Sequence, residues 1–252
     1  MAEDLYNVEL YHLTHRGNPG DVRFYQKVCR GASNVLELGC GLGRVLLPLA
    51  RQGLTLTGLD AHPGMINGLQ SLIQEADDIP TEQVELVVGD MRSFNLEQTF
   101  DRIILPFNGL FCLLHDDDVQ SCFHSVRKHL KPGGSFVFDV YVVDEEELAL
   151  IDPEEWDPIT TINEERRTIE IFEQRVWQPE VQRVDATYQY RIHEGTEVRT
   201  EEYSIPQRYL SFSQCRELLY NAQLHITQCF EDFDGNPIEE DSYHLIVWTQ
   251  GV

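Results

Sequence analysis

Along residues 34–145, segments with the apolar pattern of strands alternate with segments with the apolar pattern of helices. Segments of helical length and spacing lie between short runs of strand length, and residues 65–74 carry apolar side chains every three or four positions. The strand-like runs are residues 35–38, 54–59, 84–88, 102–105 and 135–142, and the helical segments between them are residues 43–52, 65–74 and 116–129. This alternation predicts an α/β fold with a doubly wound parallel sheet, covered by helices on both faces.

The pattern changes after Asp144. A charged stretch is followed there by segments in which apolar residues occupy every second position. From Val184 to Ile192, every second side chain would lie on the same face of a strand. Residues 169–177 and 197–205 are expected to form neighbouring strands. We expect an inserted antiparallel sheet of about three strands here. The last segments predict a return to the core, as a helix at residues 213–224 and strands at residues 227–233 and 243–249.

These patterns divide the 252 residues into three parts. Residues 1–33 form an N-terminal helical arm, residues 34–145 and 212–252 form the core, and residues 146–211 form the auxiliary antiparallel insertion. A chain of this length suits one α/β core with one embellishment.

Charge and composition narrow the class of partner. The 19 basic and 43 acidic side chains give a net charge of -24, which disfavours nucleic acid and anionic membranes. The acidity fits either solubility or a cleft for a cationic amine. The first residues lack the features of a secretory leader, and no apolar run approaches the ~18 residues of a membrane span, so we expect a cytoplasmic protein. The six cysteines show no C-x-x-C spacing, so we expect no metal site.

A glycine-rich turn follows the first predicted strand, in the sequence Val-Leu-Glu-Leu-Gly-Cys-Gly-Leu-Gly at residues 35–43. Glycines at such a turn let the backbone approach a ligand, and the following helix offers free N–H groups. Asp60 ends the second predicted strand, where its carboxylate is placed to accept hydrogen bonds from ribose hydroxyls. The dinucleotide fingerprint requires a third glycine where this chain has Arg44, which disfavours a nicotinamide-dependent oxidoreductase.

Four segments in register resemble class I S-adenosylmethionine-dependent methyltransferases: residues 35–44, 58–60, 89–91 and 130–134. The resemblance covers about residues 30–145 and implies the Rossmann-like, seven-stranded methyltransferase sheet, with S-adenosylmethionine as the methyl donor and S-adenosylhomocysteine as the product. It also implies contacts with the amino-acid end, the ribose and the adenine of the cofactor. The residues expected to make them are Glu37, Gly39, Cys40, Gly41, Gly43, Asp60, Ala61, Met65, Asp90, Met91 and the Leu105 carbonyl.

Within this set the resemblance gives each group a role. The turn from Gly39 to Gly43 wraps the amino-acid end with Glu37 steadying it, and the Leu105 carbonyl meets the amino group. Asp60 takes the ribose, and Asp90 and Met91 take the adenine. Met65 either covers the other adenine face or is a plain core residue.

The N-terminal segment at residues 11–17 narrows the resemblance to small-molecule N-methyltransferases of the sugar-amine and glycine/sarcosine types. The resemblance implies an arm that folds over the cofactor, with Tyr11 lining the methyl-transfer site and Arg23 meeting the methionine carboxylate. His15 is either a base that reaches the acceptor or an exposed loop histidine, and Asn108 is placed for a hydrogen bond to the acceptor. Cys112 stands where some relatives have a histidine.

We therefore expect methyl transfer to a small-molecule acceptor, most simply at an amine nitrogen, by in-line displacement. An O-methyltransferase and a non-catalytic cofactor-binding protein are the alternatives. The aromatic residues of the insertion line either an acceptor pocket or the buried face of its sheet, and the sequence leaves a homodimer open.

Overall fold

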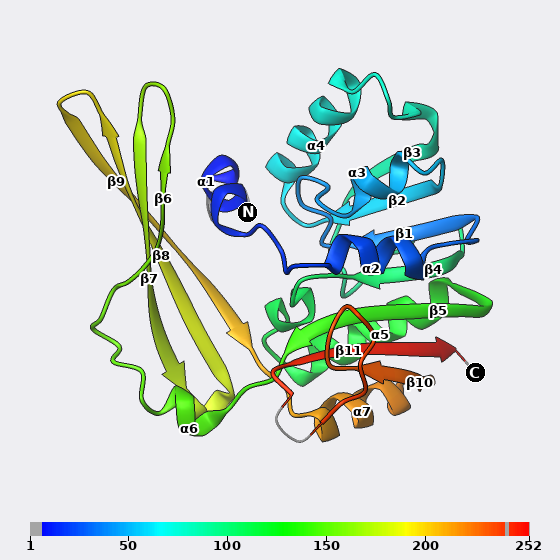
Figure 1. The fold of residues 1–252 in the computed structure, drawn as a ribbon. Helices are drawn as coiled ribbons and strands as arrows, with labels where there is room; N and C mark the ends of the chain where they lie inside the picture. The colour runs from blue at the N-terminus through cyan, green and yellow to red at the C-terminus, as the bar shows by residue number, and fades with distance from the viewer. Residues whose placement is uncertain (1–6, 240–241, 252) are drawn as a thin grey trace. The chain divides into compact units, whose positions relative to one another are not determined.

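The computed structural model describes residues 7–239 and 242–251, which form two compact units (Figure 1). Of the described residues, the larger unit contains 16–142, 210–239 and 242–251, and the smaller contains 7–15 and 143–209. The structure thus divides the predicted N-terminal arm after His15, and residues 1–6 of that arm lie outside the described residues.

Among the described residues, the larger unit is built on a seven-stranded sheet with the order β10-β11-β5-β4-β1-β2-β3. The pairs formed among β1 to β5 are parallel, whereas β11 runs antiparallel to both β5 and β10. This confirms the predicted doubly wound sheet. The strands are β1 (Asn34–Leu38), β2 (Thr55–Asp60), β3 (Val84–Val88), β4 (Phe100–Leu105), β5 (Leu130–Tyr141), β10 (Leu224–Phe230) and β11 (His244–Gly251).

The ends of the helices in this unit carry residues that stabilise helix termini. Three aspartates open α5 (Asp116–His129) and three basic residues close it, which complements the helix dipole. Ser211 and Gln214 form a reciprocal capping box at the start of α7 (Phe212–Asn221). The other helices are α2 (Asp21–Val28), α3 (Leu46–Ala50) and α4 (Pro63–Glu75).

Residues 130–134, one of the four segments that carry the resemblance, lie inside β5, which corrects the predicted start of that strand at residue 135. Leu130 pairs with Phe100, and the next pair is Ser135 with Arg102, so the intervening residues bulge out of the ladder. Gly133 has a φ of 77°, which a residue with a Cβ adopts only at a cost. The chain therefore bends locally without leaving the sheet.

The smaller unit contains, within the described residues, a four-stranded antiparallel sheet in the order β6-β7-β8-β9. The sequence predicted about three strands and missed β6 (Asp157–Asn163). Most side chains of β6 are exposed because it is an edge strand, so its sequence lacks the alternation by which the other strands were found. The other elements are α1 (Val8–Thr14), α6 (Glu145–Leu148), β7 (Thr168–Gln178), β8 (Arg183–Glu194) and β9 (Glu197–Arg208).

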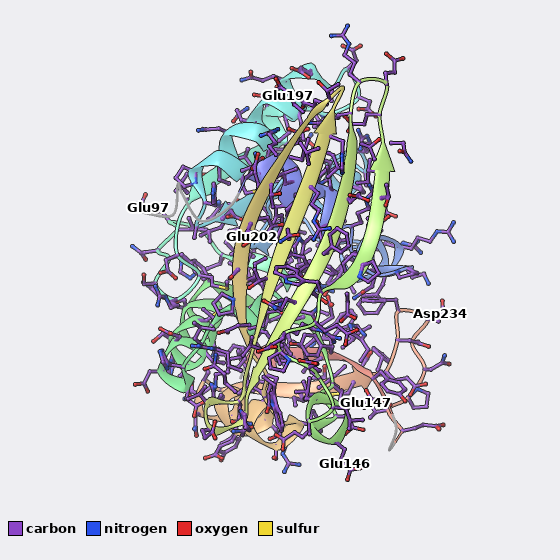
Figure 2. All side chains as sticks on the ribbon, turned by 90° about the vertical axis from the view of Figure 1, so that its left-hand side faces the viewer. Glu97, Glu146, Glu147, Glu197, Glu202 and Asp234 are labelled. Atoms are coloured by element: carbon purple, nitrogen blue, oxygen red, sulfur yellow. The ribbon has the colours of Figure 1, made fainter. Side chains whose placement is uncertain are left out.

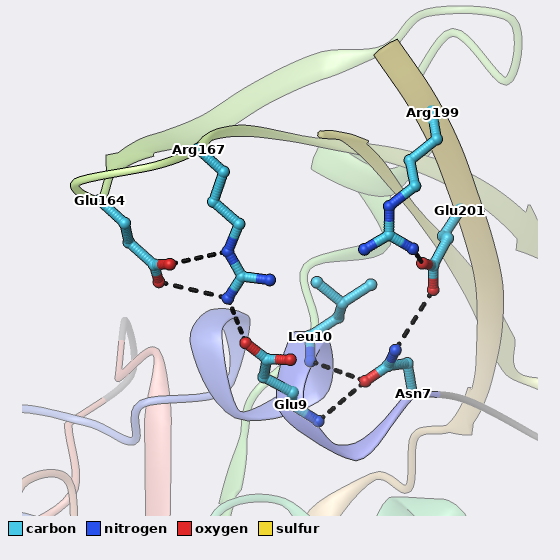
Figure 3. Close-up of polar contacts among 7 residues, drawn as sticks. All are labelled: Asn7, Glu9, Leu10, Glu164, Arg167, Arg199 and Glu201. Carbon is cyan, nitrogen blue, oxygen red and sulfur yellow. Dashed lines mark hydrogen bonds and ion pairs between the residues drawn. The ribbon is translucent and has the colours of Figure 1, made fainter. Parts of the chain in front are cut away.

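Helix α1 is an integral part of this smaller unit. Leu10 is 1% exposed, in a cluster with Ile169, Ile171, Tyr190, Ile192 and Tyr203. Polar contacts surround this apolar centre (Figure 3): Arg167 pairs with both Glu9 and Glu164, and Asn7 donates to Glu201. The Asn7 side chain also caps the helix by accepting from two backbone N–H groups.

The negative charge is spread over exposed positions in both units. Figure 2 labels six of these exposed carboxylates, among them Glu97 and Asp234 in the larger unit and Glu197 and Glu202 in the smaller. This distribution fits a solvated acidic surface. Among residues 7–239 and 242–251, no helix combines the length and apolar character needed to cross a membrane.

Candidate functional site

The predicted cofactor residues gather at the carboxyl ends of the parallel strands in the larger unit. β1 pairs with β2 on one side and β4 on the other, so the strand order reverses beside β1. A crevice forms at such a switch point because the connections leave the sheet in opposite directions. An ideal Cβ on Gly39, after β1, would lie 3.9 Å from Cδ1 of Leu105, which shows that the ends of β1 and β4 adjoin.

The turn after β1 requires glycine at three positions. Gly39, Gly41 and Gly43 have φ values of 63°, 52° and 80°, in the left-handed region that disfavours side chains. A Cβ on Gly43 would also lie 2.5 Å from a methyl carbon of Leu69 on α4. Cys40 is buried in the same turn, and its carbonyl accepts from the Gly43 N–H at 2.8 Å.

Asp60 connects this turn to the end of β2. One carboxylate oxygen accepts from the Gly41 N–H at 2.8 Å and the other from the His62 N–H at 2.8 Å. Burial raises the pKa of Asp60, and these two hydrogen bonds act in the opposite direction. Each oxygen has further acceptor capacity, so the carboxylate fits the predicted role of binding ribose hydroxyls. The neighbouring Ala61 is exposed.

Glu37 lies below the turn, near the end of β1, and is only 4% exposed. Burial raises the pKa of its carboxyl to about 8, although the nearby Arg44 lowers it. Among the described residues, its buried Oε2 atom has no hydrogen-bond partner. A buried acceptor without a partner costs free energy, so a ligand that brought a donor or a positive charge would stabilise this site. The residues present therefore fit a cofactor that carries an ammonium group.

The positively charged side chain of Arg44 follows the glycine turn directly. Its Nη1 lies 2.6 Å from a carboxylate oxygen of Asp21, and its guanidinium lies 5.2 Å from the centre of the Phe107 ring. A Cβ on Gly17 would collide with this guanidinium, at 2.0 Å from Nη1. Arg23 is exposed on α2, and its contact with the cofactor carboxylate stays a prediction.

Asp90 and Met91 follow β3, at the same edge of the sheet. Two nitrogens of Arg92 bind the Asp90 carboxylate, at 2.5 and 2.9 Å, and this pairing lowers the Asp90 pKa. The sequence pattern gave no indication that Arg92 pairs with Asp90. Met65 is 2% exposed, and its sulfur would lie 4.0 Å from a Cβ on Gly41, so it packs beside the turn. The adenine contacts of these residues stay predictions.

The segment after β4 has an unusual backbone. Phe107 and Asn108 have φ values of 56° and 58°, which are costly for a bulky residue such as phenylalanine and better tolerated by asparagine. The Asn108 side-chain oxygen accepts from the Tyr141 N–H at 2.8 Å. The structure therefore gives Asn108 a role in forming the turn, and its predicted contact with an acceptor stays a prediction.

Tyr11 and His15 belong to the smaller unit, where their rings stack with centroids 4.0 Å apart. The His15 ring also meets Tyr188 edge-on at 5.0 Å. Burial lowers the pKa of His15 to about 4, so its ring is neutral at pH 7 and a weak base. His15 is half-buried, so the alternative of an exposed loop histidine is wrong, and its role as a base stays a prediction.

The other aromatic residues of the insertion contribute mainly to its own sheet. Tyr190 and Tyr203 stack and share a short hydrogen bond, and Tyr190 is fully buried. Trp177 donates to Tyr209, which donates to Glu145 at 3.1 Å. Cys112 is exposed after β4. In the part of the chain that the structure describes, no group of three histidine, cysteine or acidic side chains is arranged to hold a metal ion.

Comparison with known proteins identifies the central part of the chain. Residues 35–134 match the family model of a methyltransferase domain. The cypemycin N-terminal methyltransferase of a Streptomyces species is 30% identical over 105 residues, which are 42% of this chain and 40% of the relative. The ubiquinone biosynthesis O-methyltransferase of Klebsiella pneumoniae is 30% identical over 128 residues, which are 49% and 50% of the two chains. The matches thus span at most about half the length of these relatives.

A solved structure extends the similarity to almost the whole fold. The sugar N-methyltransferase KedS8 of Streptoalloteichus superposes with a TM-score of 0.77, at 14% identity, over 98% of this chain and 94% of the other. At this identity the likeness concerns the fold. The match over residues 35–134 confirms the methyltransferase domain that the four sequence segments predicted, and the likeness to KedS8 confirms the predicted fold.

Proposed function

We propose that the chain is a class I S-adenosylmethionine-dependent methyltransferase, as the methyltransferase domain matched over residues 35–134 suggests, and that it transfers a methyl group to an amine nitrogen of a small molecule. Two named similarities support nitrogen as the acceptor atom: the N-terminal methyltransferase of cypemycin and the sugar N-methyltransferase KedS8. The observation that carries the cofactor assignment is the Asp60 carboxylate bonded to the Gly41 N–H beside the buried, unpartnered Oε2 of Glu37.

The residues of the larger unit would hold the cofactor through complementary groups. The glycine turn admits its amino-acid end because side chains are absent there, and Glu37 provides a carboxylate for its ammonium group. Asp60 provides acceptors for the ribose, and Met65 an apolar surface beside the turn. When bound, S-adenosylmethionine supplies a methyl group already activated by its positive sulfur.

What remains for the protein is to align the acceptor and to exclude water. A neutral amine needs no strong base for this reaction, which fits the low pKa of His15. The exposed carboxylates favour the approach of cationic amines over anionic substrates, and such an amine must release its proton to solvent before its nitrogen accepts the methyl group. Nucleic acid and membrane surfaces are disfavoured for the same reason.

The test has two stages. Calorimetric titration with S-adenosylhomocysteine and with NAD distinguishes the cofactor class, and binding of NAD alone would refute the proposal. Incubation with S-adenosylmethionine and a panel of amino sugars, amino acids and matched hydroxyl compounds, read by mass spectrometry, then identifies the acceptor atom. Methylation of hydroxyl compounds alone would favour an O-methyltransferase, a candidate supported by the similarity to the ubiquinone enzyme.

A further inference from the structure

Helix α2 presents two buried polar side chains one helical turn apart. Asp21 is 3% exposed and Tyr25 is fully buried, and their spacing places them on one face of the helix. Buried polar groups of this kind are stable only when they are hydrogen-bonded. Their hydrogen-bond partners belong to other segments of the chain, and each partner also contacts the turn that follows β4.

Tyr25 acts on this turn through a buried carboxylate. Its hydroxyl donates to Oδ1 of Asp139 at 2.5 Å, and Asp139, on β5, is fully buried. The same oxygen accepts from the Phe107 N–H at 2.9 Å, while His244 lies 3.3 Å from the other oxygen. The Asp139 carbonyl accepts from the Asn108 N–H at 3.1 Å. A single residue of β5 thus fixes both residues with left-handed backbone.

Asp21 acts on the same turn through Arg44. It holds Arg44 at 2.6 Å, and the Arg44 guanidinium covers the Phe107 ring. Phe107 is therefore held at its backbone by Asp139 and at its ring by Arg44. The two holding groups are in turn bonded to Tyr25 and Asp21 on α2.

We infer that Tyr25 and Asp139 are positioning residues for methyl transfer, which hold Phe107 and Asn108 in a costly conformation next to the cofactor's reactive centre. A left-handed backbone at two successive residues other than glycine is unfavourable and persists only where the surroundings impose it. This inference rests on the proposed function, because it takes the segment after Leu105 to face the transferred methyl group. The arrangement would keep the backbone of Phe107 and Asn108 in a fixed position next to the transferred methyl group.

The test compares two ligands that differ at the methyl position. S-adenosylhomocysteine lacks a group there, whereas sinefungin carries a protonated amine in its place. For Tyr25→Phe we expect sinefungin to bind about tenfold more weakly and S-adenosylhomocysteine within about twofold of the wild type. Tyr220→Phe, on an exposed tyrosine of α7, is the matched control and leaves both affinities unchanged.

Each outcome separates this inference from the proposed function. Equal changes for both ligands, including no change for either, would overturn the positioning role while leaving the cofactor assignment intact. A wild-type protein that binds neither ligand would overturn the proposed function and the inference together. If Tyr25→Phe does not fold, Asp139→Asn replaces it with the same expectation, since it retains an oxygen that accepts from the Phe107 N–H.

Discussion

The carboxylate of Asp60 accepts a hydrogen bond from the Gly41 N–H across 2.8 Å, so the end of β2 holds the turn that follows β1. The side chain expected to bind the ribose thus also fixes the loop expected to receive the amino-acid end of the cofactor. Substitution of Asp60 removes both functions at once, and a graded pair of variants distinguishes them.

We expect Asp60→Ala to weaken S-adenosylhomocysteine binding about a hundredfold and Asp60→Asn about tenfold, because asparagine retains one acceptor for the Gly41 N–H. Isothermal titration calorimetry measures the affinities, and circular dichroism checks that both variants fold. Equal losses in the two variants would contradict a role for Asp60 in holding the turn.

Glu37 should make the stability of the ligand-free protein fall as the pH rises. Its pKa is raised to about 8 in the folded state, so its stabilising contribution is complete below the ordinary value of 4.5 and is lost as the pH rises through 8. At pH 9, Glu37→Gln should be more stable than the wild type by on the order of 2 kcal/mol. Urea unfolding at pH 5 and pH 9 measures this, and an equal difference at both pH values would argue against it.

Cofactor binding should release a proton from the same carboxyl. At pH 7 the group is mostly protonated in the free protein, and pairing with an ammonium group favours the carboxylate. Calorimetry in two buffers of different ionisation enthalpy should show the release of close to one proton. Glu37→Gln should abolish this release and weaken binding, and a release that persists in the variant would assign the proton to another group.

Gly43 should tolerate a methyl group less well than Gly53, although both have left-handed backbone. Their φ values are 80° and 75°, but only Gly43 would bring a Cβ to 2.5 Å from Leu69. Both alanine variants incur a backbone cost of about 1 kcal/mol, and Gly43→Ala adds about 1–3 kcal/mol from overpacking. Equal free energies of unfolding in denaturant would show that α4 yields without cost.

Leu10 should contribute more to the smaller unit than the ion pairs around it. Leu10→Ala should destabilise the unit by about 2–4 kcal/mol, because it leaves a cavity between α1 and the antiparallel sheet. Arg167→Ala, which removes the pairs with Glu9 and Glu164 (Figure 3), should cost less than about 1 kcal/mol. Amide hydrogen exchange in β7 and β8 compares the two variants, and a larger effect of Arg167→Ala would reverse this ranking.

The sequence predicted the parts of the fold that local patterns determine. The predicted bounds of α5 and β3 agree with the structure, because helix-capping residues mark the ends of α5 and an apolar run marks β3. The glycine turn and Asp60 were found from the spacing of these residues in the sequence. β6 was missed because an exposed edge strand has no alternating pattern to detect.

The contacts of the candidate site that join distant segments could not be predicted in this way. Tyr25 and Asp139 are separated by 114 positions, and no local pattern connects them. Arg44 was noted only for occupying the place of a glycine, since its pairing with Asp21 depends on how α2 packs. Such pairs become visible only when the tertiary arrangement is known.

The division of the chain after His15 has a consequence for folding during synthesis. Leu10 is synthesised well before the side chains that bury it, which lie between Ile169 and Tyr203. The apolar face of helix α1 therefore stays uncovered until those residues have been translated, a delay that exposes it to chaperones or to premature association.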